Sequence, residues 1–183
     1  ICADQEFINQ IIDVNDGMAM LFGPVMDARI AYELYARLET LPIRMMAHAK
    51  AAEVLIKKMQ ENDIPGIIYP GLDTYPQFNL LNEMKNPKYG HGGMITLDCG
   101  DLKKATELAQ RLQDERFGLF AVSLGFSRTL LSCPSASTSS EIPEEEQKNI
   151  GLRPGLLRMS IGFSGNDEIL ADKFINCYHS VFK

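Results

Sequence analysis

The sequence predicts an α/β (α+β) fold, in which a small and mostly antiparallel sheet is flanked by helices. Three observations support this prediction. Two stretches of helical periodicity come first, and short apolar runs then alternate with further helical stretches from about residue 64 onward. No glycine-rich nucleotide loop joins a strand to a helix. This order is typical of a small domain whose sheet is covered by connecting helices.

The first helical region contains a break. Apolar residues recur at spacings of three and four over residues 27–59. Pro42 interrupts this stripe, and a proline in a helix interior removes a hydrogen bond at a cost of about 3 kcal/mol. We therefore expect one helix over residues 27–39 and a second one that begins near Thr40 and runs to about Asn62.

Strands and helices alternate in the rest of the chain. The strands that we expect are residues 64–69, 94–99, 119–122 and 156–162. Helices are expected after Asp101, after Asn166 and from Pro143, because these residue types favour helix N-termini. Residues 135–140 are small and polar, so they predict a loop.

Composition excludes several classes of protein. The 183 residues include 45% hydrophobic and 23% charged residues, with a formal net charge of −6. Mild acidity argues against nucleic acid as a partner, since such proteins present a basic face to phosphates. No apolar run approaches the roughly 18 residues that span a bilayer, and no signal sequence opens the chain. We expect a soluble, cytoplasmic protein without a membrane or nucleic-acid partner.

The cysteines and histidines do not predict a metal site. The four cysteines, which form no CxxC pair, are Cys2, Cys99, Cys133 and Cys177. We expect reduced thiols, as suits a reducing compartment. The three histidines do not cluster with cysteines or acids at metal-ligand spacing. His91 lies in a glycine-rich turn, where we expect a solvated side chain.

Arg158 is the residue with the strongest chemical signal. It lies in the middle of a predicted strand, on the face shared by Leu156 and Ser160. A guanidinium among apolar neighbours must be paired. A buried salt bridge or an arginine on an edge strand is favoured on the residues alone, and a clamp on a substrate carboxylate is the functional alternative. Ser123 lacks a GxSxG elbow, so we do not expect it to act as a nucleophile.

Five blocks of sequence carry a resemblance to a known family. They resemble, in order, the patterns TLxxRMxxHxxNA, YPGLxxHPQ, GGMxSF, SLGxxxTLxxxP and VRLSVG, and they begin here at Thr40, Tyr69, Gly92, Ser123 and Leu157. The chain is thereby similar to the Cys/Met-metabolism enzymes that depend on pyridoxal 5'-phosphate (PLP). The resemblance covers the chain from about residue 23 to its end. It implies an aspartate-aminotransferase-like fold of type I, represented here by its carboxyl-terminal domain.

The resemblance also implies a division of the chain. Residues 1–26 would be a remnant of the large PLP-binding domain, residues 27–62 the domain-linking helices, and residues 63–183 the carboxyl-terminal small domain. The family's PLP lysine would lie upstream of Ile1, so this chain alone is expected to be inactive and to contain no catalytic residue. The full-length protein would bind PLP through the missing amino-terminal PLP domain and form a homotetramer.

A set of substrate-binding residues follows from the resemblance. Arg158 would bind the substrate α-carboxylate, and Ser123 would lie at the active site between Val122 and Leu124. Thr138 would complete the set. An apolar residue at Val122 is similar to methionine γ-lyases, whereas cystathionine-processing members have glutamate there. The implied reaction is α,γ-elimination of L-methionine, a sulfur-containing amino acid, to methanethiol, 2-oxobutyrate and ammonia.

The chain departs from the family pattern at several places. The histidine of THxxL is absent from residues 138–142, HPQH is replaced by residues 75–78, and Phe163 with Ser164 replaces an acidic pair. The alternatives are therefore cystathionine γ-lyase, β-lyase or γ-synthase of the same family. A binding domain without catalysis is the alternative from another class of protein.

Overall fold

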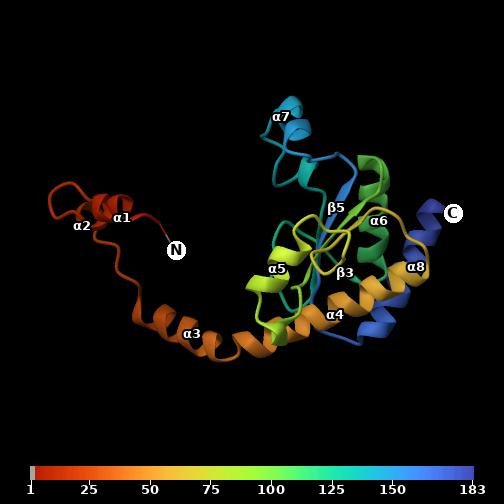
Figure 1. The fold of residues 1–183 in the computed structure, drawn as a ribbon, viewed down its shortest axis with the longest axis horizontal. Helices are drawn as coiled ribbons and strands as arrows, with labels where there is room; N and C mark the ends of the chain where they lie inside the picture. The colour runs from red at the N-terminus through yellow and green to blue at the C-terminus, as the bar shows by residue number, and fades with distance from the viewer. Residues whose placement is uncertain (1–2) are drawn as a thin grey trace. The chain divides into compact units, whose positions relative to one another are not determined.

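The computed structural model describes residues 3–183, so Cys2 lies outside the described residues (Figure 1). The chain divides into two compact units, one up to Leu41 and one over Pro42–Lys183. The predicted boundaries at residues 26 and 62 were drawn from the family resemblance and stay predictions. No helix within residues 3–183 has the length and apolar character that crossing a membrane requires.

The first unit consists of short helices. They are α1 (Gln5–Ile12), α2 (Met18–Phe22) and α3 (Ala28–Glu39). Asp4 and Asp27 accept backbone N–H groups at the N-termini of α1 and α3, which satisfies donors that have no partner within the helix. None of the three helices contains a buried residue. The unit therefore presents its apolar side chains at the surface.

The second unit is built on one sheet. Its strands are β1 (Ile67–Ile68), β2 (Met94–Asp98), β3 (Gly118–Phe120), β4 (Thr129–Ser132) and β5 (Leu156–Ser160). Their order is β1-β2-β5-β4-β3, and every adjacent pair except β3 with β4 is antiparallel. The predicted sheet is therefore confirmed. Strand β4 was not predicted, and β1 and β3 are shorter than expected.

The helices of this unit agree closely with the sequence pattern. They are α4 (Leu41–Glu61), α5 (Phe78–Met84), α6 (Leu102–Asp114), α7 (Glu144–Asn149) and α8 (Asp167–Phe182), with 3₁₀ turns η1 (Pro87–Tyr89) and η2 (Pro134–Ala136). The predicted caps are confirmed: the side chains of Asp101 and Asn166 accept N–H groups in the first turns of α6 and α8. Turn η2 lies at the start of the stretch predicted to be a loop, because Pro134 favours a helical first turn.

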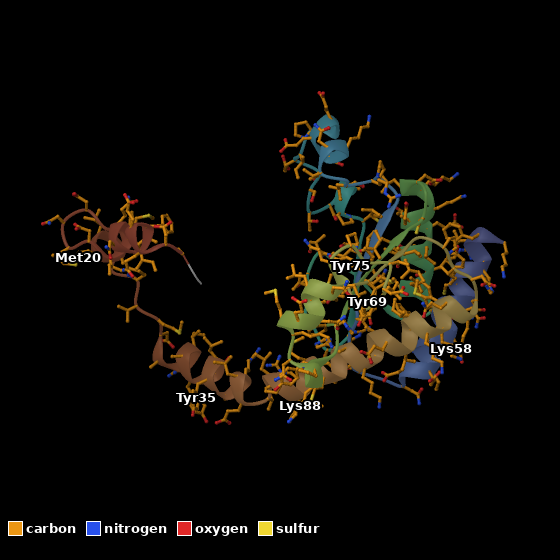
Figure 2. All side chains as sticks on the ribbon, viewed as in Figure 1. Met20, Tyr35, Lys58, Tyr69, Tyr75 and Lys88 are labelled. Atoms are coloured by element: carbon orange, nitrogen blue, oxygen red, sulfur yellow. The ribbon has the colours of Figure 1, made fainter. Side chains whose placement is uncertain are left out.

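The hydrophobic core lies between the sheet and helices α4, α6 and α8 (Figure 1). Leu157 and Met159 point into it from β5, and Leu108 and Phe174 meet them from α6 and α8; all four side chains are fully buried. Since side chains alternate along a strand, Arg158 belongs to the opposite face. Lys58, labelled in Figure 2, joins α4 to α8 through a 2.8 Å ion pair with Asp172.

Close contacts explain two of the sequence blocks. The buried Nδ1 of His48 on α4 lies 2.5 Å from the carbonyl oxygen of Ile161, and its ring meets Phe163 edge-on. A side chain at Gly93 would come within 3.1 Å of the His48 Cβ, and one at Gly162 within 2.4 Å of the Arg128 backbone. Gly93 therefore lets the start of β2 approach α4, and Gly162 lets the chain after β5 approach the start of β4.

Candidate functional site

Arg158 lies at the centre of the sheet. Its neighbours across the adjacent strands are Thr96 of β2 and Ser132 of β4. The side chain is half-buried, whereas Leu157 and Met159 on the other face are fully buried. The interpretation of Arg158 as an edge-strand residue is therefore wrong, because β5 is paired on both sides.

The guanidinium of Arg158 keeps most of its hydrogen-bonding capacity. Its Nη2 donates one long hydrogen bond, 3.4 Å, to the carbonyl oxygen of Ser123. Within residues 3–183 it forms no ion pair with a carboxylate. The structural salt bridge considered from the sequence is therefore absent from the described residues. A planar fork of N–H donors beside open surface suits a carboxylate ligand.

The segment that carries Ser123 crosses the sheet. Residues 121–128 connect β3 to β4, two parallel strands, so the chain must return across the sheet between them. The backbone N–H of Ala121 donates to Leu131 at 2.9 Å, and the N–H of Gly125 donates to Ser160 Oγ at 3.0 Å. Because Ser160 belongs to β5, the connection passes β4 to reach the strand of Arg158. We call residues 121–128 the crossover loop.

Most of the predicted set is brought together by the crossover loop. Val122 and Leu124 flank Ser123, and their side chains are each 62% exposed. Ser123 is also exposed, and its carbonyl oxygen accepts the bond from Arg158. An exposed apolar pair therefore lies beside a half-buried cation, which is an arrangement that can hold an amino acid by its carboxylate and its apolar side chain.

Thr138 lies in a different segment. It follows η2 and is exposed, and no hydrogen bond within residues 3–183 links it to Ser123 or Arg158. Gln147 of α7 fixes this segment by donating from Nε2 to the carbonyl oxygens of Ser139 at 3.2 Å and Ile142 at 2.8 Å. The role of Thr138 in substrate binding therefore rests on the family resemblance alone.

The described residues place a guanidinium that can bind a carboxylate in the sheet, without a lysine hydrogen-bonded to it. PLP enzymes bind the cofactor through a lysine amine. No hydrogen bond within residues 3–183 joins a lysine to Arg158 or Ser123; Lys58 pairs with Asp172, and Lys173 donates to the carbonyl oxygen of Glu115 at 2.7 Å. The same residues contain no cluster of acids, histidines and cysteines suited to a metal ion.

His91 and the three described cysteines lie in packed surroundings that shift their pKa values. His91 is not fully solvated as predicted: its ring stacks on Phe78 and its Nε2 lies 3.0 Å from Asn82 Oδ1. Burial, with a smaller effect of the Lys85 charge, lowers the pKa of His91. Cys99, Cys133 and Cys177 are free, buried thiols, and burial raises the pKa of Cys99 to about 12.

Two buried serines lie on the strands around Arg158, and only Ser160, which was not among the predicted site residues, bonds to the crossover loop. Ser160 is 4% exposed and its Oγ accepts the Gly125 N–H. Ser132 is 1% exposed, and its Oγ has no hydrogen-bond partner among the described residues. Strand alternation places Ser160 on the face of Arg158 from sequence alone, but its bond to the crossover loop depends on β4, which the sequence did not reveal.

Solved structures first define the class of protein. A Campylobacter jejuni structure described as an O-acetylhomoserine (thiol)-lyase, with N'-pyridoxyl-lysine-5'-monophosphate, matches with a TM-score of 0.80 at 26% identity over 97% of this chain and 41% of that chain. Cystathionine gamma-lyase from yeast gives a TM-score of 0.80 at 23% identity over 90% of this chain and 41% of that chain. The fold is therefore that of the fold type I PLP-dependent lyases, as predicted.

Sequence comparison then defines the family. The family model described as Cys/Met metabolism PLP-dependent enzyme matches residues 2–174. Methionine gamma-lyase of Arabidopsis thaliana is 40% identical over 169 residues, which are 92% of this chain and 38% of that protein. L-methionine gamma-lyase of Fusobacterium nucleatum subsp. nucleatum is 32% identical over 92% of this chain and 41% of that protein. This chain belongs to the Cys/Met metabolism PLP-dependent enzymes, and it spans about two fifths of the length of these relatives.

Proposed function

We propose that this chain forms the carboxylate-binding side of the active site in a PLP-dependent carbon–sulfur lyase that acts on L-methionine. The reaction is α,γ-elimination, which consumes one water and releases methanethiol, 2-oxobutyrate and ammonia. The observation that carries the proposal is the half-buried Arg158 guanidinium, whose only hydrogen bond within residues 3–183 is the 3.4 Å bond to Ser123. Family membership supports the chemistry.

Arg158, Val122 and Leu124 each have a defined part in this proposal. Arg158 binds the substrate carboxylate through paired N–H donors, which fixes the orientation of the amino acid at its α-carbon. Val122 and Leu124 receive the apolar thioether chain from the exposed crossover loop. PLP, held by a lysine outside residues 3–183, supplies the electron sink that labilises the substrate's Cα–H bond. Without that cofactor the chain binds a carboxylate and does not catalyse the elimination.

The preference for methionine is proposed from Val122. This side chain is 62% exposed in the crossover loop that carries Ser123. An apolar surface suits a methyl thioether, whereas a carboxylate would pair with the distal ammonium of cystathionine. The two sequence relatives described above are both methionine gamma-lyases, which supports the same choice.

A binding measurement tests the role of Arg158 without depending on turnover. In the complete PLP-loaded enzyme, Arg158→Ala is expected to raise the Kd of L-norleucine, a methionine analogue without sulfur, by at least about thirtyfold. The control is Arg111→Ala, because Arg111 forms an exposed ion pair with Glu107 on α6, and α6 packs on the opposite face of the sheet from Arg158. The control is expected to change the Kd by less than about twofold. Equal losses in both variants, or unfolding of Arg158→Ala alone, contradict the proposal.

Cystathionine cleavage is the second candidate function, and a relative from Dictyostelium discoideum, 31% identical over 74% of this chain, is a cystathionine gamma-lyase. Val122→Glu is expected to lower the ratio of kcat/KM for methionine to that for cystathionine by about tenfold or more. A wild-type enzyme that already prefers cystathionine contradicts the methionine proposal. We also propose that the full-length protein contains an amino-terminal PLP domain and forms a homotetramer.

A further inference from the structure

Strand β5 holds the crossover loop by two hydrogen bonds. Arg158 and Ser160 are two residues apart, so their side chains share one face of the sheet. Arg158 Nη2 donates to the carbonyl oxygen of Ser123 at 3.4 Å, and Ser160 Oγ accepts from the N–H of Gly125 at 3.0 Å. Both bonds end on the same three-residue stretch of the loop, so the loop is fixed to the strand that carries the carboxylate-binding group.

The two bonds differ in what a ligand does to them. The bond from Arg158 is long and half-exposed, and a substrate carboxylate would compete for the same guanidinium. The bond to Ser160 is shorter, and the Ser160 side chain is 4% exposed, so no ligand displaces it. When Arg158 turns to a carboxylate, the bond to Ser160 still holds Gly125, two residues from Ser123. The N–H groups of Phe163 and Ser164 hold only the end of the loop, through the carbonyl oxygen of Ser127 at 2.8 and 2.9 Å.

We propose that Ser160 is a positioning residue for substrate binding, which rests on the proposed function. Its hydroxyl oxygen holds Gly125, and thereby places Ser123 and Val122 beside Arg158. Gly125 has a φ of 72°, a left-handed conformation in which the chain turns and its N–H points back to β5. Ser160 thus sets the distance between the two parts of the site, the carboxylate clamp on the strand and the apolar surface on the loop.

The chain offers a matched control for this role. Ser132 is 1% exposed and lies opposite Arg158 in the sheet register, but its Oγ has no hydrogen-bond partner among residues 3–183. Ser132→Ala and Ser160→Ala remove the same buried hydroxyl from neighbouring strands. Only Ser160→Ala removes a bond to the crossover loop. Because Gly125 is exposed, water can take over its N–H in that variant, so the fold is retained.

The experiment compares both variants in the complete PLP-loaded enzyme. Ser160→Ala is expected to speed amide hydrogen exchange in residues 121–128 by about fivefold to tenfold, since one net hydrogen bond is worth a factor of about that size. It is also expected to raise the Kd of L-norleucine and the KM for methionine about fivefold to tenfold, with kcat within about twofold of wild type. Ser132→Ala is expected to leave all four quantities unchanged.

The outcomes separate this proposal from the proposed function. Equal exchange rates in the two variants would show that Ser160 does not hold the crossover loop. Faster exchange in Ser160→Ala with an unchanged Kd and KM overturns the positioning role, and so does an effect confined to kcat. A wild-type enzyme without any lyase activity contradicts the proposed function instead. In that case the hydrogen exchange and the norleucine Kd, neither of which needs turnover, still decide whether Ser160 holds the loop and shapes the site.

Discussion

The two units use apolar side chains in opposite ways. In the first unit Phe22 is 77% exposed and Val25 is 90% exposed, and helices α1 to α3 contain no buried residue. In the second unit Leu157 and Phe174 are fully buried. Apolar spacing predicted α3 of the first unit as well as α4 of the second, whereas α1 and α2 were not predicted. It does not predict which helices bury their apolar faces.

The difference comes from the sheet. Helices α4, α6 and α8 bury their apolar faces because β2, β4 and β5 offer a second layer to pack against. The described part of the first unit contains no strand, and its helices are short. Isolated helices of this length are marginal in water. Cooperative stability should therefore belong to the second unit, and the comparison can be tested by paired substitutions, one in each unit.

The largest expected difference lies between two aromatic truncations. Phe174 is fully buried and packs against the rings of Phe117 and Tyr178, at centroid distances of 5.6 and 6.5 Å. Phe174→Ala should lower the free energy of unfolding by about 3–5 kcal/mol. Tyr35 on α3, labelled in Figure 2, is 65% exposed. Tyr35→Ala should change the free energy of unfolding by less than about 0.5 kcal/mol. Urea unfolding followed by circular dichroism measures both; similar losses would contradict the comparison.

A pair of glycine substitutions should give a smaller difference. An alanine Cβ at Gly162 would lie 2.4 Å from the backbone of Arg128, so Gly162→Ala forces the strands apart and should cost about 1–3 kcal/mol. Gly23 ends α2 with a φ of 52° and has open space around it. Gly23→Ala therefore costs about 1 kcal/mol of local strain. This local cost should not move the thermal midpoint of the second unit, and a shift as large as that of Gly162→Ala would show that the units unfold together.

The smallest expected effect is a pH dependence confined to the second unit, which contains all three histidines. Burial first and the Lys85 charge second lower the pKa of His91. The stability from neutral His91 is therefore fully present above the unfolded pKa of about 6.5, and it is lost as the pH falls through the lower folded pKa. His91→Phe keeps a ring against Phe78 and does not titrate. The urea midpoint of wild type should fall relative to this variant as the pH drops toward about 5; parallel midpoints would exclude a role for His91.

The sequence predicted the fold where local signals agreed. Pro42 separated the two helices, Asp101 and Asn166 marked the starts of α6 and α8, and alternation placed β2 and β5. Strand β4 was not predicted because all four of its residues are buried. A short buried run shows no alternation, so it cannot be distinguished from other apolar segments by periodicity. The strand is defined by its neighbours in the sheet rather than by its own pattern.

The candidate site shows the same limit. Alternation correctly placed Arg158 on the face shared with Ser160, and the family resemblance drew attention to Ser123. The contact between Arg158 and Ser123 joins residues that are far apart in the chain, and it depends on where β4 lies in the sheet. Chemistry can therefore be assigned to single residues from sequence, whereas the grouping of those residues into a site requires the strand order.

The parallel pairing of β3 with β4 has a consequence for how such a site can diversify. Parallel neighbours are usually joined by a dozen or more residues with a helix, but here residues 121–128 make the return without one. A segment this short has little slack, so an insertion or deletion would pull on the strand pairing at both ends. Substrate range in this part of the molecule should therefore change by exchange of side chains such as Val122 at constant length. Engineering of the specificity should likewise search substitutions and leave the length of the loop alone.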